Sequence, residues 1–87
     1  MTPPDLLARV LALASETAGP TRTPNFLGPE TLLAGGGFWL DSVGLLELIL
    51  ACEREFGVVL DPVTDLDPAA LHTVRTLVSV LEAKLSP

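Results

Sequence analysis

The segment Leu40–Phe56 constrains the fold most, because its apolar residues repeat at helical spacing on two neighbouring faces. The first stripe, which we predict to face the core, consists of Leu45, Leu48, Ile49, Cys52 and Phe56. The second stripe consists of Val43, Leu46 and Leu50, flanked by Glu47, Glu53 and Arg54. A surface helix needs only one apolar stripe. This helix is therefore either buried nearly all round or presents its second stripe as a docking surface.

The ends of this helix are marked by its own residues. Asp41 and Ser42 open it, because their side-chain oxygens can accept hydrogen bonds from the free N–H groups of the first turn. Gly57 closes it at the position where a left-handed residue is favoured. The same free N–H groups and the positive end of the helix dipole favour a bound phosphate. The hydroxyl of Ser42 is thus expected where a phosphate ester could be held.

Shorter patterns predict helices on either side. Thr2 and the prolines after it begin a first helix, whose apolar residues continue to about Thr17. Asp67 and Pro68 predict a very short helix through residue 71. Thr73 caps a last helix, whose apolar side consists of Val74, Leu77, Val78, Leu81 and Leu85.

A long loop is predicted between the first helix and Leu40–Phe56, because prolines and glycines interrupt residues 19–37. We expect four apolar residues to anchor this loop to the core, namely Phe26, Leu27, Leu32 and Leu33. Residues 58–60 are expected as apolar chain packed under the bundle rather than as a strand. The predicted fold is all-α: a small four-helix bundle of three main helices and one short helix, with residues 1–87 as a single domain.

The charge is concentrated in one part of the chain. Residues 41–67 contain seven acidic residues and one basic residue, Arg54, which accounts for the whole net charge of −6. This excess argues against a nucleic-acid partner and favours partners that present Arg or Lys, although it could simply be a solvated face. No apolar run is long enough for a membrane span, and no export signal is visible at the start. We expect a cytoplasmic monomer.

Groups that would make the chain an enzyme or a metal protein are missing. A nucleophilic serine needs a base held against it, and the only histidine, His72, is thirty positions after Ser42. His72 is interpreted as a capping or partly buried residue, and Cys52, the only cysteine, as an inert core thiol. One Cys and one His offer no zinc ligand set, and the acidic residues at 61–67 lack a calcium-loop pattern. Trp39 either plugs the top of the bundle or contacts something attached at Ser42.

The residues around Ser42 also support a resemblance. The string Leu40–Leu48, followed by Glu53–Gly57, resembles the Asp-Ser-Leu signature of acyl carrier proteins, and the likeness extends over essentially the whole chain. Val43 replaces the commoner leucine, Gly44 stands where fatty-acid carriers usually have an acid, and Arg54 interrupts the acidic run. Together with the glycine-rich lead-in before Leu40, these features are similar to discrete carriers of polyketide or other specialised pathways.

The resemblance implies a function for the signature residues. Asp41 and Ser42 would form the cofactor site, with a 4′-phosphopantetheine arm on Ser42. A magnesium-dependent phosphopantetheinyl transferase would transfer the arm from coenzyme A and supply the missing base and metal. The thiol of the arm would then hold acyl groups as thioesters for acyl-loading and condensing enzymes with basic docking surfaces. The residues that would meet these partners are Val43, Leu46, Glu47, Leu50 and Glu53.

Two other interpretations remain open at this stage. A peptidyl or aminoacyl carrier would share the fold and the serine. From a different class, an unmodified helical docking module would bind a basic partner through the second stripe, and replacing Ser42 with alanine would leave its function intact. Leu46, Ile49 and the loop anchors either line a pocket for an attached chain or are ordinary core. The acyl cargo is not indicated by any residue.

Overall fold

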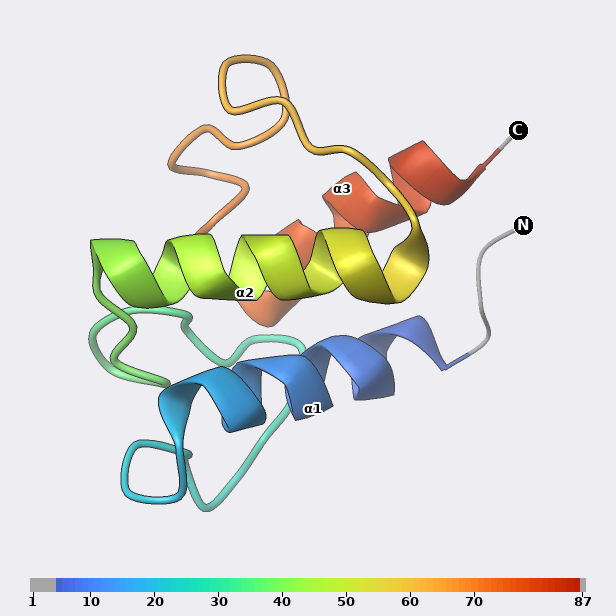
Figure 1. Cartoon of the computed structure of the whole chain (residues 1–87). Helices are drawn as coiled ribbons and strands as arrows, with labels where there is room; N and C mark the ends of the chain where they lie inside the picture. Colours follow the sequence, from blue (N-terminus) through green and yellow to red (C-terminus); the bar gives the residue numbers. More distant parts are fainter. Residues whose placement is uncertain (1–4, 87) are drawn as a thin grey trace.

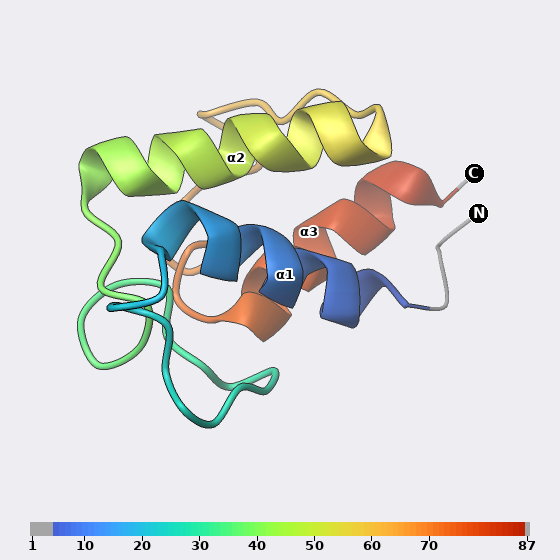
Figure 2. The ribbon, with the colours of Figure 1, turned by 60° about the horizontal axis from the view of Figure 1, so that its bottom comes forward.

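Three helices form the fold, shown in Figure 1 from a computed structural model that describes residues 5–86. They are α1 (Leu6–Ala18), α2 (Ser42–Phe56) and α3 (Val74–Leu85). Helix α1 packs against both α2 and α3, and Figure 2 shows it below α2 in the turned view. The predicted all-α fold, with a long loop between the first two helices, is confirmed. Within residues 5–86 the strand-like structure is limited to one isolated bridge, between Leu32 and Thr73.

The predicted ends of α2 are confirmed. The N–H of Gly44 donates to Asp41 Oδ1 at 2.8 Å, so Asp41 is the N-cap of this helix. At the other end, Gly57 has a φ of 66° and its N–H donates to the carbonyl of Glu53. A left-handed φ is strained for a residue with a Cβ atom, which explains why glycine ends the helix here.

The first apolar stripe of α2 faces the core, as predicted. Leu48, Ile49 and Cys52 are buried, and Leu45 and Phe56 are partly buried against the same cluster. The second stripe remains exposed, so the alternative of a helix buried nearly all round is wrong. Arg9 of α1 reinforces this packing, because it pairs with Glu55 and lies over the ring of Phe56, 4.8 Å from its centroid.

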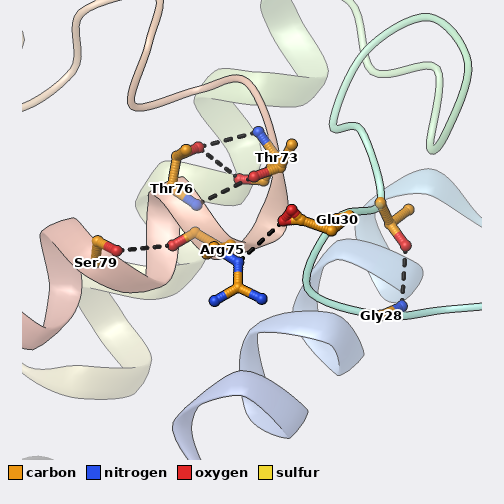
Figure 3. A network of polar contacts seen from close by, with 7 residues as sticks. Gly28, Glu30, Thr73, Arg75, Thr76 and Ser79 are labelled. Carbon is orange, nitrogen blue, oxygen red and sulfur yellow. Dashed lines mark hydrogen bonds and ion pairs between the residues drawn. The ribbon is translucent and has the colours of Figure 1, made fainter.

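The outer helices largely follow the sequence pattern. Helix α1 ends at Ala18, one residue after the predicted end at about Thr17, while its expected start at Thr2 lies outside the described residues. Thr73 caps α3 as predicted, and Thr76 completes a capping box with it: each side chain accepts from the backbone N–H of the other (Figure 3).

The predicted short helix at residues 67–71 is wrong. Asp67 does act as a cap, because its Oδ1 accepts from the N–H of Ala70 at 2.8 Å. The chain then makes only a turn, and no fourth helix occurs within residues 5–86. A single turn gains too few hydrogen bonds to propagate, and Thr73 must be extended to cap α3.

Only part of the predicted anchoring of the long loop is confirmed. Leu33 is fully buried and Leu32 is partly buried, whereas Phe26 is 92% exposed and Leu27 is also exposed. The prediction is therefore wrong for Phe26 and Leu27. Their place in the core is taken by Phe38 and Leu40, both buried immediately before α2. Within residues 58–60, Leu60 is buried and Val58 packs against the core, but Val59 is exposed.

Backbone hydrogen bonds also tie the loop to the start of α3. The N–H of Leu33 donates to the carbonyl of His72, and the N–H of Val74 donates to that of Thr31. Figure 3 shows the adjacent ion pair, in which Arg75 Nε lies 3.0 Å from Glu30 Oε1. These contacts hold the chain before α2 in place. No helix within residues 5–86 combines the length and the apolar character of a membrane span.

Candidate functional site

Ser42 is the first residue of α2, and its side chain is exposed. The cap is Asp41, so the hydroxyl of Ser42 is not used to begin the helix; it has no hydrogen-bond partner among residues 5–86. Helix geometry also leaves the N–H groups of Ser42 and Val43 without intrahelical acceptors. The predicted placement of Ser42, at an accessible helix beginning next to an aspartate cap, is thus confirmed.

A groove runs beside Ser42, with a volume of about 500 Å³. Among the residues of α2 that line it, Ser42 is the first and Glu53 the last, about 16 Å further along the helix axis. The wall between them is mostly leucine and isoleucine, from α2 and from the segment between α2 and α3: Leu45, Leu46, Ile49, Leu60, Leu66 and Leu71. We call this feature the Ser42 groove. It gives an apolar group attached near Ser42 a surface on which to lie.

Sequence reasoning identified only part of this groove. Leu46 and Ile49 were candidates and do line it, whereas the candidate loop anchors between residues 26 and 33 do not. Leu60, Leu66 and Leu71 were missed. The apolar run at residues 58–60 was a signal for the first of these, because a short apolar segment without a strand partner must pack against a helix.

The predicted partner residues on α2 do not all face the same way. Val43, Leu46 and Leu50 are exposed and form what we call the outer face of α2. Glu47 is exposed beside it and makes no hydrogen bond or ion pair with residues 5–86. Glu53 instead folds back, and its Oε2 accepts from the N–H of Leu60 at 2.7 Å. The structure therefore brings four of the five predicted residues to one exposed surface and gives Glu53 a structural contact.

Arg54 changes the electrostatics of the outer face. It lines a shallow hollow between α1 and α2 together with Glu16 and Glu47. Two carboxylates, those of Glu16 and Glu47, and one guanidinium therefore border the apolar residues on this side, and neither carboxylate has a hydrogen-bond or ion-pair partner among residues 5–86. A partner that covers the outer face meets both signs of charge rather than a purely acidic surface.

Acidic residues between α2 and α3 stabilise the turns of that segment. The N–H of Val63 donates to Asp61 Oδ1, and the N–H of Asp61 donates to Asp65 Oδ2, each at 2.7 Å. The hydrogen bond from Asp61, followed by that from Lys84, lowers the pKa of Asp65 below its usual value. Within residues 5–86, no three His, Cys, Asp or Glu side chains come together as metal ligands.

The remaining candidate side chains add no activating group to Ser42. Cys52 is buried, and burial, with smaller contributions from Glu53 and Glu55, raises the pKa of its thiol to about 12. The interpretation of Cys52 as a core thiol is confirmed. His72 is exposed, and Asp41 is engaged in capping. Trp39 is 61% exposed, so the expectation that it plugs the bundle is wrong: Phe38 and Leu40 fill the core on either side of it.

Two of the three glutamates of α2, Glu53 and Glu47, provide a direct test of this assignment. We expect Glu53→Ala to lower the free energy of unfolding by about 1.5 kcal/mol, because it leaves the N–H of Leu60 without its charged acceptor. Glu47→Ala is the matched control, with an expected change within about 0.5 kcal/mol. Urea unfolding followed by circular dichroism measures both. Equal effects of the two substitutions would contradict a structural role for Glu53.

Known proteins provide no further guide to the function. The chain was compared with models of protein families, with curated proteins and with solved structures, and none of the three comparisons gave a match. The functional assignment therefore rests on the residues around Ser42 and on their geometry.

Proposed function

We propose that the protein is an acyl carrier protein in which Ser42 bears a 4′-phosphopantetheine arm. The observation that carries the proposal is an exposed serine hydroxyl, without a hydrogen-bond partner in residues 5–86, directly after an aspartate N-cap and beside an apolar groove. The Leu-Asp-Ser-Val string that surrounds it resembles the signature of these carriers. The chain is then a substrate and shuttle for other enzymes rather than an enzyme itself.

Loading requires little of this chain beyond an accessible oxygen. The Ser42 oxygen attacks the phosphorus next to the pantetheine half of coenzyme A, and the adenosine-containing half leaves with the electrons of the broken P–O bond. The serine proton passes to a base of the transferase, which also supplies the magnesium ion. The new phosphodiester lies at the N-terminus of α2, where the helix dipole favours negative charge.

The Ser42 groove suits the second part of the function. An acyl group on the thiol of the arm exposes methylene groups to water, and each one that is buried contributes about 0.8 kcal/mol. The apolar wall of the groove can shelter such a group between visits to partner enzymes. Val43 and Glu47 are exposed on α2 and do not line the groove, so this side of the helix remains accessible for those partners, which we take to be the transferase and the acyl-loading and condensing enzymes.

Polyketide or related specialised biosynthesis is the pathway class that fits the departures from fatty-acid carriers. A side chain at position 44 would meet the side chain of Leu40 and the capping oxygen of Asp41 within 3.3 Å. Glycine there leaves the cap undisturbed. Arg54, beside the outer face, replaces part of the acidic run. A peptidyl or aminoacyl carrier would use the same serine and differ in its cargo.

One observation favours a second candidate, an unmodified docking module. Val43, Leu46 and Leu50 are each at least 44% exposed, which is an unusual amount of apolar surface for one helix. Such a module would bind its partner equally well with alanine at position 42. A carrier would lose its function with the same substitution.

Incubation with coenzyme A, magnesium and a broad-specificity phosphopantetheinyl transferase tests the proposal. We expect the intact mass to increase by one phosphopantetheine and one thiol to become reactive toward a thiol reagent under native conditions. The new reactive thiol can be assigned to the arm because the protein has one cysteine, Cys52. The burial and raised pKa of Cys52 keep its thiol protonated and inaccessible at neutral pH. Denaturation should then expose a second thiol. An unchanged mass, with no thiol gained, would contradict the carrier function.

A further inference from the structure

Trp39 has a backbone conformation that its side chain disfavours. Its φ is 58°, and among residues 5–86 no other non-glycine residue has a positive φ. A left-handed conformation brings Cβ too close to the backbone, so it persists only where surrounding contacts impose it. Residues held in this way are concentrated at functional sites.

The contacts that impose this conformation come from the loop before α2. The N–H of Trp39 donates to the carbonyl of Ala34 at 2.9 Å, and the neighbouring N–H groups of Phe38 and Leu40 donate to the carbonyls of Leu32 and Leu33. Because Phe38 and Leu40 are both buried, the chain at Trp39 is fixed from either side. The indole is thereby turned outward on a rigid backbone.

The indole contributes little to the core that holds it. Its six-membered ring lies against Gly35, where an added Cβ would be 3.3 Å from Trp39 Cζ3. Trp39 nevertheless keeps 61% of its surface exposed. A residue that served only the fold would gain more by burying this surface. The backbone conformation of Trp39 therefore keeps the indole ring exposed instead of burying it in the core.

Ser42 is within easy reach of this ring. Ser42 is the third residue after Trp39, so the Cα atoms of the two residues are at most about 11 Å apart. A chain attached to Ser42 meets groups at that range at an effective concentration of about millimolar or higher. Trp39 does not line the Ser42 groove, so it offers a second surface to the same attached chain.

We propose that Trp39 is a positioning residue for the phosphopantetheine arm, and that its exposed indole packs against the amide and methylene groups of the arm next to Ser42. The inference rests on the proposed function, because it requires an arm on Ser42. Planar amides and alkyl groups both pack well on an indole face. The contact would hold the arm outside the groove and ready for a partner enzyme.

Fluorescence of Trp39 tests this directly, because it is the only tryptophan of the protein. The protein is loaded from coenzyme A, loading is verified by intact mass, and the purified loaded and unloaded forms are titrated with acrylamide. An aromatic contact of ordinary strength favours the state in which the arm covers the indole about fivefold. We therefore expect the quenching constant to fall about twofold on loading. A quenching constant that is unchanged in fully loaded protein overturns the role of Trp39 but leaves the carrier function standing.

A matched reporter variant serves as the control. Trp39→Phe combined with Phe26→Trp moves the tryptophan to a position whose native side chain is 92% exposed. The part of this loop that follows α1 lies on the side of α1 away from α2 in Figure 1, whereas the last part leads back to the start of α2. The quenching constant of this variant should not change on loading. An equal decrease in both proteins would mean a global effect of loading and would also overturn the proposal.

Discussion

Ser42→Ala is expected to abolish loading with phosphopantetheine completely while changing the free energy of unfolding by no more than about 0.5 kcal/mol. The side chain is exposed, and neither the cap of α2 nor the core depends on it. The substitution removes only the hydroxyl group, whose oxygen is the atom that must attack the phosphorus. Intact mass after incubation with coenzyme A, magnesium and transferase measures loading, and thermal unfolding measures stability.

Two other helical serines are matched controls for this substitution. Ser15 Oγ donates to the carbonyl of Leu11 at 2.9 Å, and Ser79 Oγ donates to that of Arg75 at 3.1 Å, as Figure 3 shows for Ser79. Both hydroxyls lie within helices and already have an acceptor, so Ser15→Ala and Ser79→Ala should load fully. Normal loading of Ser42→Ala would show that the arm is attached to another residue and would contradict the assignment of Ser42 as the attachment site.

Gly37→Ala is expected to destabilise the protein strongly, although it adds only one methyl group. Gly37 is buried in the loop before α2, and an added Cβ would lie 2.0 Å from the carbonyl oxygen of Leu32. That oxygen accepts from the N–H of Phe38, so relieving the clash must break the turn that buries Phe38. We expect a loss of about 3 kcal/mol in the free energy of unfolding, and a melting temperature lower by roughly 15 °C.

Gly28→Ala is the control for Gly37→Ala. Gly28 lies in the same long loop, its φ is outside the left-handed region, and an added Cβ would meet nothing within 4 Å. Its effect should stay within about 1 kcal/mol and could even be stabilising, because alanine restricts the unfolded chain. Thermal and urea unfolding of both variants make the comparison. If the two substitutions cost the same, the tight turn between Leu32 and Leu40 does not exist in solution.

Helix α2 could be predicted closely because its signals are local. A capping aspartate, a left-handed glycine and a stripe of apolar residues act within one or two turns of the helix they define. The same holds for Thr73 at the start of α3. The exposed position of Ser42 follows from this local chemistry, so the most important residue of the site was predictable.

The errors in the fold arise where distant segments compete for the core. Phe26 and Leu27 were expected to anchor the loop in the core, but the residues before α2 that reach the core are Leu33, Phe38 and Leu40. Composition cannot decide which of several loop hydrophobes reaches the core. At residues 67–71 a good cap was present, but the chain had to become extended at Thr73 to begin α3, and a helix could not continue.

The details of the site depended on contacts that the sequence does not display. Glu53 is an acidic residue beside the second apolar stripe, as expected of a docking residue, yet its carboxylate accepts from the N–H of Leu60, seven positions away. Leu66 and Leu71 line the Ser42 groove from a segment without regular structure. Trp39 has an outward orientation because two buried neighbours and a hydrogen-bonded loop impose it, which no local pattern could reveal.

The most direct test of the central claim is to locate the attached group in the loaded wild-type protein by fragmentation mass spectrometry. The account predicts that the added mass lies on the peptide containing Ser42, and that fragments on either side of this residue place it on its side chain. Fragmentation should also release the arm, as expected for a phosphate ester. Attachment to any other residue, or a protein that accepts no group from coenzyme A, would contradict the account.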